Sequence, residues 1–358
     1  MFTARPLAAV AAASALALAT SSAAAAQGDP ASPRPSRYSQ INLVSDVPAM
    51  APVTDPNLVN AWGLSQGPTT PLWVSDNGTD QSTLYRSGTP ATIVPLVVKI
   101  EGGAPTGTVF NSTGGFVLSG NGHTALARFL FAGENGNITA WNPDITGTTA
   151  VRVAHTADAV YKGLALVADL HAPRLLAANF HSNRIDVFSA DFAPVPHRHA
   201  FRSVGIPHGY APFNVVVLGH RVFVSYAEQD PARHDDVAGP GHGFVNVFDT
   251  EGRFLRHLVR RGVLDSPWGL AIAPRGFGSL SGALLVGNFG NGRIHAFDRH
   301  SGRLLATMRG ADGRPIAIGG LWGLLPGNGA SAPTTDLWFS AGPNDESHGL
   351  LGVLRVLP

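Results

Sequence analysis

Short apolar runs follow one another from about residue 40 to the end of the chain, and polar turns rich in glycine and asparagine separate them. The runs lack helical periodicity and several alternate apolar with polar positions, so they predict β-strands. Asn135-Gly136 and Asn291-Gly292 each lie between two runs, which is typical of tight hairpin turns. The runs that end in small or polar residues are 72–75, 129–132, 175–178, 222–225, 284–287 and 337–340.

A tripeptide precedes these runs and recurs about every 50 residues. Three copies read Trp-Gly-Leu and three are looser versions, at 62–64, 106–108, 162–164, 213–215, 268–270 and 322–324. The same order of antiparallel strands follows each copy, which predicts an all-β fold, a six-bladed β-propeller. A β-sandwich or a parallel β-helix is the alternative. A sandwich requires no period, however, and the coils of a β-helix are much shorter.

The last repeat ends after its third strand, at 350–357, whereas an apolar segment at 41–47 precedes the first tripeptide. We predict that this N-terminal strand closes the last blade, which would hold the termini together and remove an exposed sheet edge. The central glycines would avoid clashes where the first strands crowd around the channel. Trp62, Trp268 and Trp322 occupy equivalent points of different repeats, so we expect them to fill wedges between blades rather than form a ligand cage.

The N-terminal region predicts export. Residues 1–26 contain Arg5, an apolar stretch at 7–18 and three closing alanines, which indicates a cleaved signal peptide. A membrane anchor is the alternative, but the stretch is alanine-rich and short for a bilayer. Residues 27–38 then form a Pro/Ser-rich disordered linker, and 39–358 form the propeller domain. We expect a secreted, periplasmic or extracellular monomer whose mature chain has no membrane span.

Composition excludes several classes of function. The chain has 42 Gly and 27 Pro among 358 residues, 14% charged residues and a formal net charge of +1, so a nucleic-acid partner is not expected. The absence of cysteine excludes disulfide scaffolds, thiolate catalysis and Cys-ligated zinc. There is no Gly-x-Ser-x-Gly elbow, and the glycine-rich 287–292 reads as a hairpin because no helix follows it.

Polar residues at the ends of the second strands would form a ring at one channel mouth. The ligand candidates in this ring are Asp76, Asn77, Glu134, Asn179 and Asn288. Insertions at 229–243 and 343–349 follow two of these ends, in repeats that only one blade separates, so they could meet over the mouth. The metal candidates in and beside them are Glu228, Asp235, Asp236, Asp345, Glu346 and His348. Carboxylates with amide oxygens suit Ca²⁺, and histidines would permit another divalent metal. Alternatively, these are solvated residues of Asx-turns.

Several long stretches carry a family resemblance, among them 45–64, 74–85, 177–188, 235–249, 284–298 and 340–350. They resemble a family of uncharacterised exported bacterial six-bladed propeller proteins, some of which have a C-terminal exosortase-type sorting tail. The sequence lacks that tail, which argues against attachment to the cell envelope. More distantly, the repeats resemble NHL and SMP-30/gluconolactonase-like propellers, a resemblance that implies either metal-dependent hydrolases and lyases or pure binding modules.

The candidate residues and the resemblance are consistent with two functions. The first is a binding module for a small molecule or an envelope or matrix component at the channel mouth. The second is a metal-dependent, lactonase-like hydrolase or lyase, in which Glu228 or Asp235 beside His348 activates a metal-bound water. No complete catalytic constellation can be assembled from the sequence, so we assign no catalytic residue and favour binding.

Overall fold

The computed structural model describes residues 1–3, 35–120, 122–170, 172–196 and 200–358. Contacts divide the chain into two units, Met1–Arg34 and Pro35–Pro358, and the following account concerns the second. Apart from residues 1–3, the predicted signal peptide lies outside the described residues, as does most of the predicted linker. Within the described ranges, no helix has the length and apolar character needed to cross a membrane.

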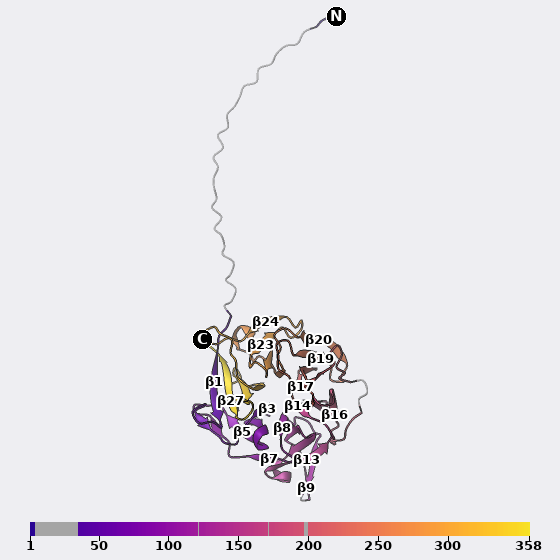
Figure 1. The fold of residues 1–358 in the computed structure, drawn as a ribbon, viewed down its shortest axis with the longest axis vertical. Coiled ribbons are helices and arrows are strands. Elements are labelled where there is room, and N and C mark those ends of the chain that lie inside the picture. The colour runs from indigo at the N-terminus through magenta and orange to yellow at the C-terminus, as the bar shows by residue number, and fades with distance from the viewer. Residues whose placement is uncertain (4–34, 121, 171, 197–199) are drawn as a thin grey trace. The chain divides into compact units, whose positions relative to one another are not determined.

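Six inner strands begin at or near the recurring tripeptides. They are β3 (Ala61–Ser65), β8 (Pro105–Phe110), β14 (Tyr161–Val167), β17 (Tyr210–Leu218), β21 (Pro267–Ile272) and β25 (Leu321–Pro326). Each packs beside the next along the chain, and β25 packs beside β3, so the series closes on itself. Figure 1 shows β3, β8, β14 and β17 around the centre and β7, β13, β16 and β20 toward the rim. The predicted all-β fold is confirmed, and its arrangement is propeller-like.

Antiparallel sheets extend outward from these inner strands. One contains β17, β18 (Arg221–Glu228), β19 (Phe244–Phe248) and β20 (Phe254–Arg260) in that order. The next contains β21, β22 (Leu284–Asn288), β23 (Ile294–Phe297) and β24 (Leu304–Thr307). A three-stranded sheet contains β14, β15 (Arg174–Asn179) and β16 (Arg184–Phe188). Each inner strand therefore lies at one edge of its sheet.

The first two repeats share one sheet, which the sequence pattern did not predict. Its order is β3, β4 (Leu72–Asp76), β5 (Gln81–Arg86), β7 (Val98–Ile100), β13 (Thr149–His155), β12 (Asn137–Trp141), β11 (Phe129–Gly133) and β8, with β6 (Thr92–Ile93) beside β5. A short parallel pairing of β7 with β13 joins the two antiparallel halves. The small additions are the hairpin of β9 (Val117–Gly120) with β10 (His123–Leu126) and the one-turn helix α1 (Pro143–Thr146).

The N-terminal strand completes the last sheet. β1 (Tyr38–Ser45) pairs antiparallel with β27 (Leu350–Val356), followed by β26 (Leu337–Ala341) and β25, while β2 (Val53–Thr54) flanks β1. The predicted pairing of the segment before the first tripeptide with the last strand is thus confirmed. Tyr38, which the sequence places in the linker, instead begins β1, and its buried hydroxyl donates a hydrogen bond to the carbonyl oxygen of Phe277 at 3.0 Å.

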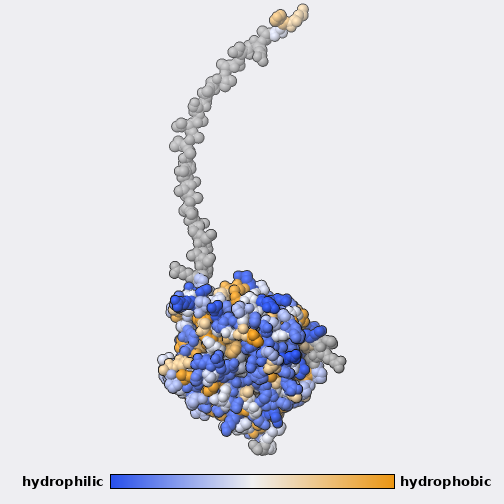
Figure 2. All heavy atoms as spheres, viewed as in Figure 1, coloured by the Kyte–Doolittle hydropathy of each residue, from blue (hydrophilic) through white to orange (hydrophobic). Residues whose placement is uncertain are grey.

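Apolar side chains from both faces of the strands pack between neighbouring repeats. Trp73, for example, stacks on Phe129 with ring centroids 4.0 Å apart. The surface seen in Figure 2 is mainly hydrophilic, with small scattered apolar areas. Crowding of the inner strands explains their central glycines, as predicted, because a Cβ on Gly107 would overlap the backbone of Leu164. The inner strands therefore approach one another closely enough for their side chains to meet at the centre.

Candidate functional site

Aromatic side chains of the inner strands and adjoining turns meet in one cluster. This aromatic plug consists of Trp62, Phe180, Phe213, Trp268, Phe289 and Trp322. Ring centroids of Trp62 and Trp322 are 3.7 Å apart, and those of Trp62 and Trp268 are 6.2 Å apart. The prediction that the three tryptophans fill separate wedges between blades was wrong. Equivalent positions of inner strands face a common centre, so the repeat brings these side chains together.

Lys162 occupies the position of these tryptophans in its own repeat. Its side chain is only 2% exposed, and its Nζ lies 5.1 Å from the centroid of the Trp62 ring. The ammonium donates hydrogen bonds to Glu134 and, at 2.9 Å, to Oδ1 of Asp235. Burial by itself lowers the pKa of Lys162, but these two carboxylates outweigh it and raise the pKa above its usual value. Lys162 is therefore charged at neutral pH.

Asn60, immediately before β3, connects the plug to the polar groups around Lys162. Its Oδ1 accepts hydrogen bonds from the indole nitrogens of Trp62 at 2.9 Å and Trp322 at 3.1 Å. Its Nδ2 donates to Asn77 Oδ1 at 3.2 Å and to Glu346 Oε2 at 2.6 Å. Because one amide satisfies four partners, the plug and the polar groups form a single network.

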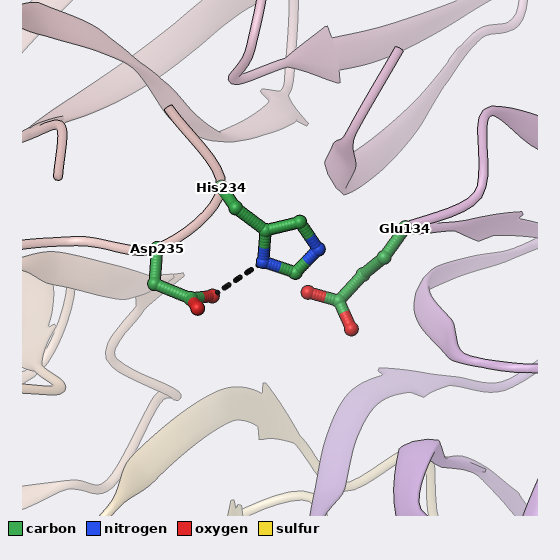
Figure 3. A group of neighbouring side chains, drawn as sticks. All are labelled: Glu134, His234 and Asp235. Carbon is green, nitrogen blue, oxygen red and sulfur yellow. Dashed lines mark hydrogen bonds and ion pairs between the residues drawn. The ribbon is translucent and has the colours of Figure 1, made fainter. Parts of the chain in front are cut away.

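Asp235 reaches Lys162 from the insertion after β18. The carboxylate of Asp230 accepts hydrogen bonds from the backbone nitrogens of His234 and Asp235, which fixes the turn. Figure 3 shows His234 and Asp235 facing Glu134, and His234 Nδ1 lies 3.0 Å from Asp235 Oδ1. Partial burial by itself would raise the pKa of Asp235, but Lys162 and His234 outweigh it and bring the pKa below its usual value. The carboxylate therefore stays ionised.

We call the residues of this network the mouth cluster: Asn60, Asn77, Glu134, Lys162, His234, Asp235 and Glu346. Asn77 closes the network by donating from Nδ2 to Glu134 Oε2 at 3.0 Å. Burial raises the pKa of Glu346, and burial raises that of neighbouring Asp236 to about 6. The cluster therefore combines one cation with three acids, of which Glu346 ionises less readily than usual.

The fit of a divalent metal can be judged from the donor atoms. Glu134, His234 and Asp235 each offer one ligand atom, and these atoms lie within 4.8 Å of one another. The ammonium of Lys162, however, binds both carboxylates and occupies the place that a metal between them would take. A protonated lysine at this position repels a divalent cation. In this arrangement Glu134 and Asp235 hold the ammonium group of Lys162, and together with His234 they do not fit Ca²⁺ or another divalent metal.

Of the predicted channel-mouth residues, Asn77 and Glu134 belong to the mouth cluster, whereas three are fully buried and bonded to other groups. Asp76 accepts a hydrogen bond from Thr83 at 2.7 Å, and burial raises its pKa well above the usual value. The other two are Asn179, which donates to Asp186, and Asn288, which donates to the carbonyl oxygen of Val263.

Of the predicted metal ligands, Asp235 and Glu346 join the mouth cluster and Asp236 lies beside it. Glu228 instead accepts a hydrogen bond from the hydroxyl of Tyr210 at 3.0 Å, with His242 beside it. Asp345 is exposed. The proposed partnership of His348 with Glu228 or Asp235 is not present, because His348 Nδ1 lies 2.8 Å from Oδ2 of Asp46, just after β1.

Sequence reasoning missed Asn60 and Lys162 as site residues. A signal existed for Lys162, because its position in the repeat is aromatic in four of the six copies and threonine in one other, so that lysine is the only charged residue there. Such an exception at a position that points to the centre predicts a charge in the channel. For Asn60, we find no comparable signal in the sequence.

Comparison with solved structures supports the fold. A streptogramin B lyase structure has a TM-score of 0.51 and 10% identity, covering 89% of this chain and 97% of that chain. The GH93 α-L-arabinofuranosidase of Fusarium graminearum in complex with arabinobiose has a TM-score of 0.52 and 12% identity, covering 88% and 97%. Virginiamycin B lyase from Staphylococcus aureus has a TM-score of 0.51 and 10% identity, covering 90% and 99%. At these identities the likeness shows the fold alone, and with the closed series of inner strands it defines a β-propeller-like protein.

Sequence comparison then gives the family. "Uncharacterized protein R648" of Acanthamoeba polyphaga mimivirus is 32% identical over 321 residues, covering 87% of this chain and 78% of the viral protein. "Uncharacterized protein L690" of the same virus is 32% identical over 323 residues, covering 87% and 84%. The chain belongs to the family of these mimivirus proteins. No family model matches it. Because these relatives are viral, they do not support the expected membership in an exported bacterial family.

Proposed function

We propose that this protein is a six-bladed propeller that binds a small molecule at the mouth cluster. The six inner strands, which contact one another in a closed series, support the blade number. The observation that carries the binding proposal is the buried Lys162 ammonium, held by Glu134 and Asp235 above the aromatic plug. Charges are costly to bury, and ionisable groups in perturbing environments are concentrated at functional sites.

The chemistry of the cluster favours a ligand rich in hydrogen-bond donors. Ionised carboxylates only accept hydrogen bonds, and those of Asp235 and Glu134 are 65% and 15% exposed at the side chain. The amides of Asn60 and Asn77 donate to Glu346 and Glu134 and so hold these two carboxylates in fixed orientations. Such preorganised acceptors suit the hydroxyl groups of a sugar or polyol, or an organic ammonium group.

The binding proposal is tested by calorimetric titration with a panel of neutral mono- and disaccharides and simple organic ammonium ions. We expect saturable binding of at least one probe, and a loss of about tenfold or more in affinity for Glu134→Gln, because the variant replaces a charge-assisted acceptor. Asp312→Asn is the matched control, since Asp312 is an exposed acid outside the cluster, near Arg314. Binding that is equal in both variants would contradict the proposal, as would no binding across the panel.

A metal-dependent hydrolase or lyase is the less favoured function. Lys162 lies between the carboxylates that would hold the metal, and His348 is paired with Asp46. Elemental analysis of the purified protein, together with a lactone panel assayed with and without chelator, tests this alternative. Stoichiometric metal with chelator-sensitive turnover would favour the enzyme over the binding module.

We also propose that residues 1–26 direct export and are cleaved, and that the processed protein is a monomer. The support is the charged, apolar and small-residue order at the N-terminus. N-terminal sequencing of protein recovered from outside the cells is expected to begin at Gln27, and light scattering is expected to give a single-chain mass. An intact N-terminus on protein retained inside the cells would contradict export.

A further inference from the structure

A cavity lies in the channel, on the far side of the aromatic plug from the mouth cluster. It encloses about 520 Å³ and is lined by the inner strands from their glycines onward, including Gly63 and Gly107. The mouth cluster gathers instead around the starts of these strands, where Asn60 and Lys162 lie. Trp268 of the plug contributes to the lining, so the plug lies between this cavity and the mouth cluster.

The lining of this channel cavity is uncharged. Aliphatic side chains provide most of it, among them Leu64, Val109, Leu166, Val217 and Leu325. None of the described residues that line it is acidic, basic or histidine. Its volume lies within the range of about 300–1,000 Å³ that is usual for preformed small-molecule sites.

Most polar side chains of the lining are bonded to the protein. Asn214 donates to the carbonyl oxygen of Trp268 at 2.8 Å, and Thr108 donates to that of Leu130 at 3.1 Å. Asn328 donates to the carbonyl oxygens of Gly67 and Thr70. The remaining polar groups are the hydroxyls of Ser65 and Ser112 and backbone groups of the inner strands, which are edge strands of their sheets. The cavity thus offers mainly apolar walls with a few hydrogen-bonding groups.

We infer that this channel cavity is a second binding site, for a neutral and mainly apolar small molecule that carries few hydrogen-bonding groups. Transfer of apolar ligand surface from water to apolar walls is favourable, whereas a charged ligand would lose its hydration without finding a counter-charge. The ligand class is therefore opposite to that of the mouth cluster. The site is independent of the proposed function, because the aromatic plug lies between the two.

The test uses a matched pair of fluorescent probes, neutral N-phenyl-1-naphthylamine and its anionic relative 8-anilinonaphthalene-1-sulfonate. The neutral probe is expected to bind saturably with quenching of tryptophan emission, because Trp268 lines the cavity. The anionic probe is expected to bind about tenfold more weakly or not at all. Glu134→Gln is expected to leave binding of the neutral probe unchanged, which separates this site from the mouth cluster.

Two variants change the cavity and one serves as the control. Leu166→Arg places a charge on the lining and is expected to weaken binding of the neutral probe by about tenfold. Ser112→Trp alters an exposed lining residue, which protects folding, and is expected to narrow the cavity and weaken binding in the same direction. Leu304→Arg, at an exposed leucine on β24, is expected to have no effect. The inference is overturned if the neutral probe does not bind, if the anionic probe binds equally well, or if the folded Ser112→Trp variant binds like the wild type.

Discussion

At the scale of single residues, Lys162 is the exception that defines the site. Its repeat places a lysine where three others place tryptophan, and its stem enters the same aromatic environment while its ammonium meets Glu134 and Asp235. A buried cation of this kind is stable only while its partners are present. Each partner comes from a different part of the chain, so the three charges depend on one another and on the closed series of strands.

Replacing Lys162 with methionine keeps the apolar stem and removes the charge. Glu134 and Asp235 then face each other without a cation, and we expect the free energy of unfolding to fall by about 2 kcal/mol, because the exposure of Asp235 screens part of the repulsion. Urea denaturation at pH 7 measures this loss. The control is Lys99→Met, which alters the other lysine of the chain, an exposed one, and is expected to change stability by less than about 0.5 kcal/mol. Equal effects of the two substitutions would contradict the account of the site.

Asp236 gives a pH-dependent prediction. Burial raises its pKa to about 6 from the usual value near 3.8. The folded state thus binds this proton more tightly than the unfolded state, and the resulting stabilisation is present below about pH 4 and lost as the pH rises to about 6. Asp236→Asn removes this loss, so the stability of the variant relative to the wild type is expected to rise between pH 4 and pH 6 and then level off.

Urea denaturation of both proteins at several pH values from 4 to 8 measures this difference. Other acids titrate in the same window, but they are common to both proteins and cancel in the comparison. A difference in stability that does not vary with pH would show that Asp236 titrates normally.

At the scale of elements, the apolar pattern predicted the second strands, the hairpins and the pairing of 41–47 with the last strand. These features follow from local alternation and from turn residues, which a sequence displays directly. The pairing of β7 with β13 was not predicted, because it joins two short rim strands of different repeats in parallel. No turn connects such strands, so nothing local in the sequence marks their contact.

The inner strands supply the prediction at this scale. A Cβ on Gly107 would overlap the backbone of Leu164 in the neighbouring inner strand, and backbone cannot move aside as a flexible side chain can. We expect Gly107→Ala to lower the free energy of unfolding by about 3 kcal/mol. Gly114→Ala is the control, since no atom lies within 4 Å of its added Cβ. If thermal unfolding gives equal midpoints for the two variants, the inner strands are not crowded as described.

At the scale of the whole molecule, a channel with two unlike ends emerges from the repeat. Sequence reasoning placed Asn77 and Glu134 near one mouth because they follow second strands. It placed Asp235 and Glu346 there because insertions on one face of a rigid scaffold can meet. It treated equivalent tryptophans as separated, although equivalence about a common centre makes them converge. The cavity beyond the plug was not predicted either. Its walls are ordinary strand residues, which come to line one common space only when the series of inner strands closes.

A double-mutant cycle between Glu134 and Lys162 tests this account most directly. The lysine lies on β14 and the acid in the β11–β12 turn, so the two side chains meet only where neighbouring inner strands converge. The free energies of unfolding of the wild type, Glu134→Gln, Lys162→Met and the double variant give their coupling. We predict a favourable coupling energy of about 1 kcal/mol or more. Effects that add to within about 0.5 kcal/mol would mean that the two side chains do not interact, and would contradict the mouth cluster built around them.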